Sequence, residues 1–346
     1  MKRAGLLVAA ALAGCGDPVD DGSQFLPHLS DYHLFTGALA DQKPVAGLVP
    51  YEVASPLYSD GAQKLRFIQL PAGAKIHFDA TGRWQFPDGT TIVKTFYYDH
   101  DQRDATLGRR VLETRLLLNQ GGAWSAITYV WNDAQTEADR FVAGKALHVD
   151  YIDPDGVARA VGYQVPSTPT CKNCHGQAKR FVPLGPRTRQ LNRTHDYGAG
   201  AENQLAHFAA AGMFDGALPD PATLEALVEP RGTASVEKRA RSWLEANCAH
   251  CHNGDGYASS TDLELEADTA TPIDFGACRH PVAAGNASGG LLYDIVPGQP
   301  DNSIMIHRMK SNAPQTKMPQ LPLTTVDEFG VKLVTDWITG LQGACQ

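Results

Sequence analysis

Alternating apolar and polar residues run through the first half of the chain. Two pairs of such stretches are separated by turn-forming residues, Asn-Gln-Gly-Gly at 119–122 and Asp-Pro-Asp-Gly at 153–156. Short connections of this kind between alternating stretches are typical of β-hairpins. The predicted hairpins pair residues 111–118 with 123–131, and residues 146–152 with 157–165. The region from about residue 25 to residue 170 is therefore predicted to be an antiparallel sheet or small sandwich of at least six strands.

In the last third of the chain, apolar residues recur at helical spacing instead. Ser235 can cap a helix whose apolar face carries Val236, Ala240, Trp243 and Leu244. This spacing predicts a helix that runs directly toward residue 248.

The final helix is predicted from both of its ends. Residues 325–328 (Thr-Val-Asp-Glu) have the pattern of a capping box, and Gly340 is a typical helix terminator. The apolar face of this helix comprises Val326, Phe329, Leu333, Val334, Trp337 and Ile338. Shorter helices are predicted at about 201–211 and after residues 220–221 (Asp-Pro), whereas residues 183–192 are predicted to form a loop.

These patterns predict an α+β protein, in which an N-terminal antiparallel β-sheet or sandwich domain precedes an all-α domain. We expect a β-rich domain at residues 25–190, a helical connector at 191–234 and a second domain at 235–346. A length of 346 residues agrees with two domains.

Composition and charge exclude several classes of protein. Apolar residues make up 43% of the chain, charged residues 20%, and the formal net charge is −8. These values argue against a disordered chain, a coiled coil and a polytopic membrane protein. Nucleic-acid binding is not expected, because neutralising phosphates requires a basic face and no long run of Lys and Arg occurs.

The N-terminus has the layout of a secretory signal. Lys2 and Arg3 precede an apolar run at 4–14, and residues 12–15 (Leu-Ala-Gly-Cys) resemble a bacterial lipobox. We therefore expect a lipoprotein signal peptide at 1–14, acylation of Cys15 and a tether at 15–24. The alternative is ordinary cleavage that leaves Cys15 free. Because Gly16 rather than Asp would follow the acylated cysteine, the sequence favours a lipid-anchored protein of the outer membrane over the inner one, facing the periplasm or the cell surface.

Four of the seven cysteines stand in two C-x-x-C-H patterns. The patterns comprise Cys171, Cys174 and His175, and Cys248, Cys251 and His252. This is the attachment motif of c-type haem. The two thiols add to the haem vinyl groups, and the histidine that follows supplies the proximal nitrogen to the iron. The sequence therefore predicts two covalently bound c-type haems.

Zinc is the alternative ligand of two C-x-x-C pairs. Cys174 and Cys248 are 74 positions apart, whereas zinc ribbons separate their pairs by about 15–20 residues. Zinc also does not require a histidine directly after each second cysteine. The remaining two cysteines, Cys278 and Cys345, would both lie in an oxidising compartment, which predicts a disulfide between them. Two free buried thiols are the alternative.

The chain from residue 235 onward resembles a class I cytochrome c domain. The resemblance rests on the helix leading into the second motif, on residues 297–303 and 317–319, and on the amphipathic final helix. It implies that Met318, which precedes a proline, is the sixth ligand of the second haem iron. Met305 and Met309 are rivals that lack the Met-Pro context, and Met318 as a simple core residue is a further alternative.

The whole expected mature chain resembles a family of bacterial dihaem c-type cytochromes of the lipoprotein type. The stretches that carry this resemblance are residues 55–62, 86–90, 94–97, 113–115, 129–134, 184–192 and 203–205. Residues 86–94 are also similar to a strand of cytochrome c′-beta, a β-sandwich haem protein with an open iron face. That resemblance implies Lys94 as a possible neighbour of the first haem, although an exposed strand lysine is the commoner case.

Two functions follow from the predicted haems. The first is single-electron transfer with a redox partner protein in the cell envelope. The second is a haem enzyme, peroxidase-like or acting on small nitrogen compounds, with the first haem as an open reaction centre and the second as an electron port. The sixth position of the first haem would distinguish them; it is either open or filled by one of the candidates His77, Lys94, His148, His195, His207 and Met213.

Overall fold

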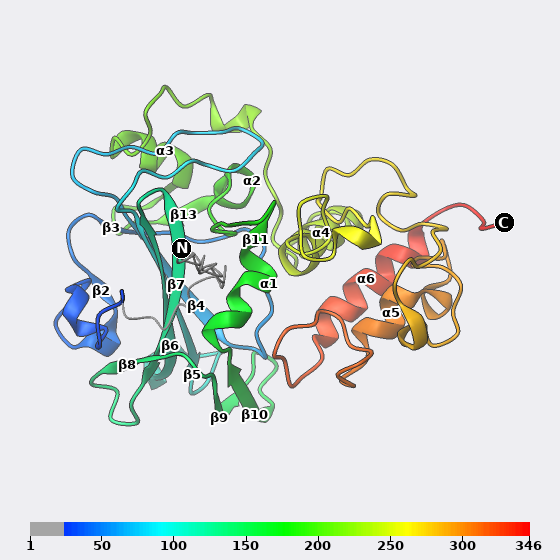
Figure 1. The fold of residues 1–346 in the computed structure, drawn as a ribbon, viewed down its shortest axis with the longest axis horizontal. Coiled ribbons are helices and arrows are strands. Elements are labelled where there is room, and N and C mark those ends of the chain that lie inside the picture. Colours follow the sequence, from blue (N-terminus) through cyan, green and yellow to red (C-terminus); the bar gives the residue numbers. More distant parts are fainter. Residues whose placement is uncertain (1–23) are drawn as a thin grey trace, which may run out of the picture.

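The computed structural model describes residues 24–346 and has a mixed α+β architecture. Strands gather on one side of the molecule, and the helices α4 to α6 lie on the other (Figure 1). The expected signal peptide, Cys15 and most of the tether lie outside the described residues. Among residues 24–346, no helix is both long and apolar enough to cross a membrane.

A six-stranded antiparallel sheet is the centre of the first half. Its strand order is β3-β4-β5-β6-β7-β8, so each strand pairs with its neighbour in sequence. These strands are β3 (Leu48–Pro50), β4 (Gln63–Gln69), β5 (Thr91–Asp99), β6 (Arg109–Gln120), β7 (Ala123–Trp131) and β8 (Ala138–Phe141). The hairpin predicted around 119–122 is thus confirmed as β6–β7.

Four two-stranded sheets surround the central one. The second predicted hairpin is confirmed as β9–β10, whose residues pair in register around the turn at 153–156. These smaller sheets consist of β1 (Phe35–Thr36) with β2 (Lys43–Pro44), β9 (Lys145–Ile152) with β10 (Ala158–Val165), β11 (Gly176–Gln177) with β12 (Arg180–Phe181), and β13 (Thr194–Asp196) with β14 (Ala201–Asn203).

The helices of the described chain are mostly short. They are α1 (Cys171–His175), α2 (Thr188–Leu191), α3 (Gln204–Ala210), α4 (Val236–Leu244), α5 (Ile304–Met309) and α6 (Glu328–Gly340). Helix α4 begins as predicted, since the Ser235 hydroxyl accepts a hydrogen bond from the Lys238 amide at 3.3 Å. Its residues Ala240, Trp243 and Leu244 are buried in one core with the predicted apolar face of α6.

The predicted capping box of α6 is wrong, because the cap lies two positions later than expected. Asp327, not Thr325, caps the helix, by accepting a hydrogen bond from the Gly330 amide at 3.0 Å. Thr325 instead donates its amide and its hydroxyl to Asp60, at 2.9 and 2.7 Å. A tertiary contact has therefore taken the side chain that the local pattern assigned to the cap.

Two other local predictions are also corrected. The predicted loop at 183–192 contains α2, a single buried turn. The helix predicted after Asp220 is only a 3-10 turn, Pro221–Thr223, although Asp220 caps it as expected. That turn ends where the backbone becomes extended at Leu224, and the Leu227 amide then donates to the Arg189 carbonyl at 2.7 Å. Docking on α2 thus replaces a further helical turn.

Candidate functional site

The first C-x-x-C-H motif forms the short helix α1 over the central sheet. Strand β10 leads toward it, and Pro166 and a 3-10 turn, Thr168–Thr170, intervene. The prediction that a strand rather than a helix precedes this motif is therefore confirmed. Cys171 packs against the core that includes Ile92 and Leu117 of the sheet.

The ring of His175 is held in one orientation. Its Nδ1 atom donates to the Val182 carbonyl at 2.8 Å, and its ring stacks on Phe181 with 4.8 Å between centroids. Because a carbonyl only accepts, Nδ1 carries the proton and Nε2 keeps its lone pair. Burial lowers the pKa of His175 to about 4, which keeps the ring neutral. A neutral, oriented imidazole with a free Nε2 is the form that binds a metal.

The second motif lies at the end of a continuous helical segment. Helix α4 passes into a π-helical stretch, Glu245–Ala249, that contains Cys248. His252 follows, and its Nδ1 lies 3.0 Å from the Thr261 hydroxyl oxygen. That hydroxyl donates its only proton to the Ala258 carbonyl at 2.7 Å, so it must accept from His252. Nε2 of His252 is therefore also free, and burial lowers the pKa of this ring to about 4.

The two motifs lie against each other. The Sγ atoms of Cys174 and Cys251 and a ring nitrogen of His250 all lie within 4.8 Å of one another. The Gln177 side chain donates to the His250 carbonyl at 2.7 Å, and the Ala178 amide donates to the Asp255 carbonyl at 3.0 Å. The structure thus joins two segments that are far apart in sequence.

The contact between the two thiols separates their proton affinities. Hydrogen bonding to Cys251 lowers the pKa of Cys174 to about 4, and the same interaction raises the pKa of Cys251. Burial raises the pKa of Cys248 to about 12. Of the two sulfurs in contact, only that of Cys174 therefore favours the thiolate form.

The residues present do not form the Cys₄ site of the zinc alternative. Within residues 24–346, Cys174, His250 and Cys251 form the one group with metal-ligand spacing, and neither Cys171 nor Cys248 belongs to it. A structural zinc site usually has four ligands. The arrangement therefore leaves the first cysteine of each motif without a role in zinc binding.

A cavity of about 750 Å³ lies between α1 and the central sheet, and it is lined by Cys171, Cys174 and His175. Apolar side chains of the sheet, including Ile92, Phe96 and Leu117, form part of its wall. This volume is within the range of about 300–1,000 Å³ that cofactor and small-molecule sites occupy. Two thiols, a histidine with a free Nε2 and an apolar wall together fit a covalently attached haem.

The space beside Met318, the predicted sixth ligand of the second haem, is much smaller. Met318 lines a cavity of about 20 Å³ together with Trp243, Asn247 and Met309. Met318 therefore lies beside the helical segment that carries Cys248, but His252 is not among the residues that line this cavity. At this motif the fit to a haem rests on the histidine and the two thiols, and the ligand role of Met318 stays a prediction.

Five of the six candidate sixth ligands of the first haem lie away from the large cavity. His77 pairs with Asp215, His148 with Asp150 and His207 with Glu202, each near the surface. The remaining two, His195 and Met213, contact Tyr197 and a buried core respectively. Of the six, only Lys94 lines the cavity.

A buried ion-pair network holds the two motif regions together. Arg189 of α2 lies 2.9 Å from Glu245, and both side chains are about 95% buried. Arg189 also contacts Asp268 at 2.7 Å, and Arg187 contacts Glu266 at 2.7 Å. These arginines belong to the segment 184–192 and the acids to the region around the second motif, so the network fixes one motif against the other.

Asp60 forms a second connection between the two regions. It is 2% exposed, and its carboxylate accepts hydrogen bonds from the amides of Thr324 and Thr325. Nearby, the Asn247 side chain accepts from the Tyr58 amide at 2.7 Å. Tyr58 and Asp60 belong to the segment 55–62, which thus contacts residues on both sides of the second motif.

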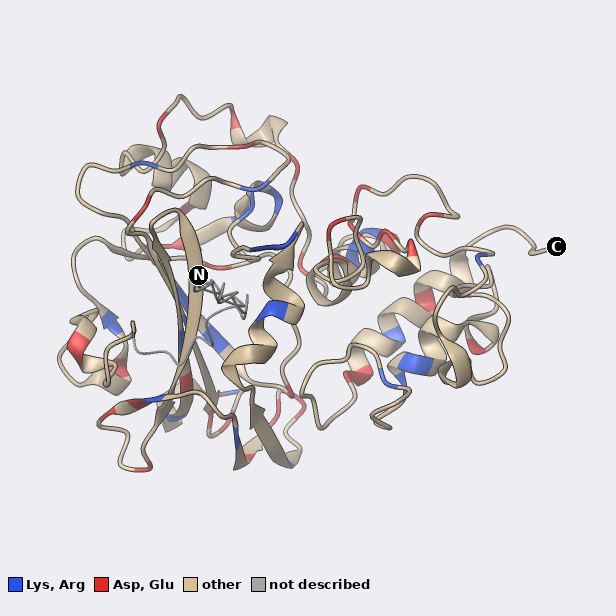
Figure 2. Ribbon diagram, viewed as in Figure 1, with Lys and Arg blue, Asp and Glu red and all other residues tan. Residues whose placement is uncertain are grey.

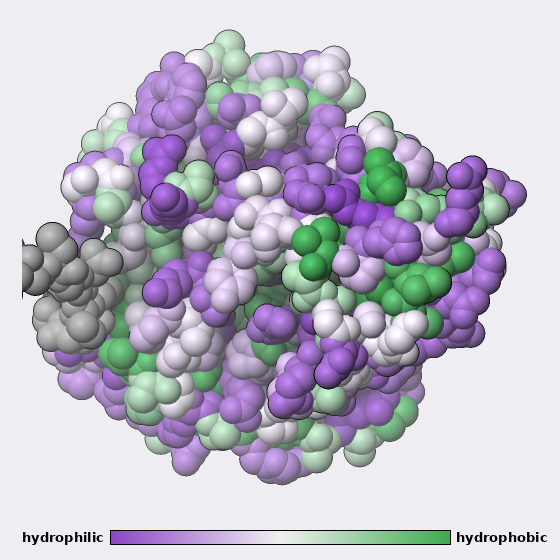
Figure 3. Space-filling model, turned by 45° about the vertical axis from the view of Figure 1, so that its right-hand side comes forward, coloured by the Kyte–Doolittle hydropathy of each residue, from purple (hydrophilic) through white to green (hydrophobic). Residues whose placement is uncertain are grey.

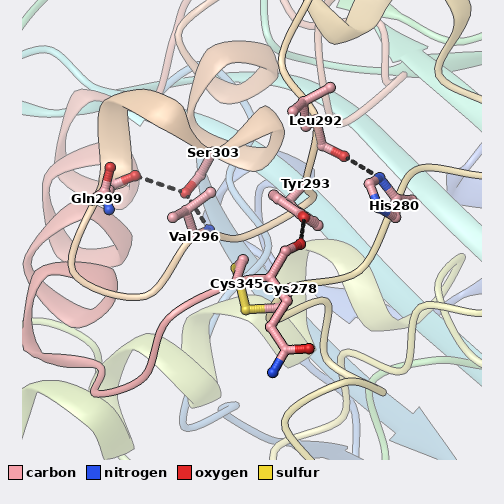
Figure 4. The surroundings of a disulfide bond; sticks show 9 residues. Cys278, His280, Leu292, Tyr293, Val296, Gln299, Ser303 and Cys345 are labelled. Carbon is pink, nitrogen blue, oxygen red and sulfur yellow. Dashed lines mark hydrogen bonds between the residues drawn. A yellow bond between two sulfur atoms is a disulfide. The ribbon is translucent and has the colours of Figure 1, made fainter.

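The predicted disulfide between Cys278 and Cys345 is confirmed. It ties the end of the chain to the loop before Tyr293, whose hydroxyl donates to the Gln346 carbonyl (Figure 4). In the same surroundings, His280 donates to the Leu292 carbonyl at 3.0 Å. The chain end that the disulfide holds lies on the side of the helical region opposite to α1 (Figure 1).

Sequence reasoning missed three residues of the large cavity, namely Arg66, Arg115 and His250. His250 lies inside the second motif, so its position in the sequence could have indicated that it belongs to the site. The two arginines come from strands β4 and β6, and their convergence depends on strand register, which no local pattern shows.

Comparisons of the chain with family models, curated proteins and solved structures found no match. The resemblances described from the sequence therefore stay predictions.

Proposed function

We propose that the protein is a dihaem c-type cytochrome that transfers single electrons in the cell envelope. One observation carries the proposal: two complete C-x-x-C-H motifs meet in space, and each histidine has Nδ1 occupied by an acceptor and Nε2 free. A bound haem supplies an iron that gains and loses one electron reversibly. Zinc binding would not need both histidines to be prepared in this way.

The residues have distinct roles in this proposal. The four motif cysteines hold two haems, and His175 and His252 are the proximal ligands. Met318 is the proposed sixth ligand of the second haem, in an all-α class I cytochrome c domain at 235–346. Arg189 and Asp60 position the two sites, because they connect the regions that carry them.

The short separation of the motifs gives the electron a path within the chain. Cys174 and Cys251 would each carry a haem, and their sulfurs lie in one group within 4.8 Å. An electron received at one haem therefore has a neighbour to move to before it leaves to a redox partner protein. We also propose that acylated Cys15 anchors the chain to the outer membrane, where that partner is reached.

A haem enzyme is the second candidate, and the large cavity beside His175 favours it. Five of the six candidate sixth ligands lie away from this cavity, so the sixth position of the first haem would be open unless Lys94 fills it. The two functions are compatible, since the second haem would deliver electrons to the first.

Haem counting tests the proposal. The chain with its leader is produced in a host that attaches c-type haem, and the purified protein is analysed by a pyridine haemochrome assay and intact mass. We expect two haems per chain. His175→Ala and His252→Ala should each lower the yield of fully loaded protein, whereas the exposed His77→Ala, as the matched control, should not. Protein with zinc and four unmodified motif thiols would overturn the proposal.

Met318→Ala tests the ligand of the second haem in the same preparation. Loss of the soft sixth ligand should remove the methionine-to-iron charge-transfer band and lower the potential of one haem. Met305→Ala is the control. An unchanged band in Met318→Ala would assign the ligand elsewhere while leaving the haem count intact.

A further inference from the structure

Three cations form a row across the central sheet. Arg66 on β4 stands opposite Lys94 on β5, and Lys94 stands opposite Arg115 on β6. Directly opposed residues of neighbouring strands have side chains on the same face, about 4.5–5.5 Å apart at Cβ, and like charges there are destabilising. All three residues line the large cavity, and Figure 2 shows basic positions on the strands at the level of α1. Such a row of like charges is destabilising unless another group compensates it.

Only Arg115 in this row has a close carboxylate. It forms a bidentate pair with Glu113 at 2.9 and 2.5 Å, and the buried Glu113 also accepts from the Tyr163 hydroxyl. Arg66 is 4.0 Å from the half-exposed Glu52. Among the described residues, the Lys94 amine lies over the ring of Phe96, whose centroid is 4.9 Å from Nζ.

The acids of the same cavity cannot serve Lys94, because they are already engaged. Glu245 and Glu266 pair with Arg187 and Arg189, and Asp60 accepts from Thr324 and Thr325. Burial and the charges of Arg66 and Arg115 lower the pKa of the Lys94 amine well below its ordinary value. Keeping Lys94 charged in this cavity is therefore costly, and an anion bound beside it would offset that cost and favour the protonated amine.

We propose that Arg66 and Lys94 bind a carboxylate or a small oxyanion inside the cavity, next to the first motif. The site lies close to the haem-binding residues, since the charge of Lys94 is among the influences that act on His175. The ligand has two sources with the same chemistry, which are a soluble monovalent anion and a propionate of the first haem. Only the propionate requires a bound haem, so the inference rests on the proposed function for that source alone.

Calorimetric titration of the purified haem protein with sodium formate tests the soluble source. Saturable binding is expected in the wild type, and Lys94→Met should weaken it at least about tenfold, as for the loss of one charge-assisted hydrogen bond. Lys94→Arg should retain binding. Lys43→Met, the same kind of change on an exposed position of β2, is the matched control and should not alter it.

The reduction potential tests the other source. If formate does not bind the wild type but Lys94→Met lowers the potential of one haem only, the anion is the propionate. Absence of formate binding together with an unchanged potential overturns the inference.

These outcomes are separable from failure of the proposed function. Two haems per chain without either effect would reject the anion site alone. A chain without haem would reject the proposed function, and formate binding would still report on the cation row.

Discussion

The two C-x-x-C-H motifs share a sequence pattern but lie in contrasting surroundings. The first stands on a one-turn helix beside a cavity of about 750 Å³ that contains buried charges. The second continues a longer helical segment into a packed core, and the cavity beside Met318 has about 20 Å³. A single water needs about 10–15 Å³ of such space. The first motif therefore borders space for a cofactor, whereas the cavity beside Met318 has room for about one water.

The contrast teaches how one chain can combine two tasks. A site that keeps unpaired cations and empty space gives up stability, whereas a close-packed core regains it. Hydrophobic residues are visible at the surface of the helical side in Figure 3. Exposed apolar side chains occur in both regions, however, with Leu107 and Val157 in the first half and Val282 and Leu292 in the second.

The largest effect is expected from Arg189→Ala, which would break the contact between the two regions. Without Arg189, the buried Glu245 keeps only the longer contact with Arg187 at 3.9 Å, and breaking such a buried pair costs about 3–5 kcal/mol of unfolding free energy. Urea unfolding measures this value, and hydrogen exchange should show exposure at the contact of the motifs.

Arg110→Ala is the matched control, because Arg110 pairs with the fully exposed Asp133 at 3.4 Å and should contribute about 0–1 kcal/mol. Equal effects of the two substitutions would mean that the network does not hold the regions together.

Removal of the disulfide should destabilise the region of the second motif and leave the region of the first motif unchanged. The link between Cys278 and Cys345 spans 67 positions, and the chain-entropy model predicts a loss of about 4 kcal/mol when both residues become serine. Hydrogen exchange should increase in residues 235–346 and remain unchanged in the central sheet. An equal increase in both regions would contradict independent stability of the two sites.

The smallest effect concerns pH and Asp294 in the packed region. Burial raises the pKa of Asp294 to about 6, so the folded protein retains this proton at pH values where the unfolded chain loses it. The stability of the region should therefore fall as pH rises from about 4 to about 6. After allowance for solvent screening, Asp294→Asn should add about 1 kcal/mol at neutral pH and flatten the profile. Asp301→Asn, on an exposed side chain, should leave the pH profile of unfolding unchanged.

Local patterns predicted the elements whose causes are local. The turns at 119–122 and 153–156 and the cap at Ser235 involve neighbouring residues, and the structure contains them as expected. Helix α2 could not be predicted in this way, because its single turn is held by distant partners; Trp84, for example, donates to the Thr188 hydroxyl. The competition for Thr325 between a cap and Asp60 is likewise decided by a residue 265 positions away.

The sequence indicated which residues form the candidate site but not how they are arranged. Cysteine spacing identified both motifs, and the count of remaining cysteines identified the disulfide. The row of Arg66, Lys94 and Arg115 depends on the register of three strands, and a shift of one residue would turn one of these side chains to the other face. Such an alignment is a property of the assembled sheet.

The close approach of Cys174 and Cys251 has a consequence for the order of maturation. Two neighbouring thiols, one of them a thiolate, are well placed to oxidise to a disulfide in the compartment that forms the link between Cys278 and Cys345. If the chain folded completely before haem was attached, a disulfide between these two cysteines would block the attachment. On the proposed function, the attachment machinery must therefore act on a chain whose halves have not yet docked, and the ion-pair network closes only afterwards.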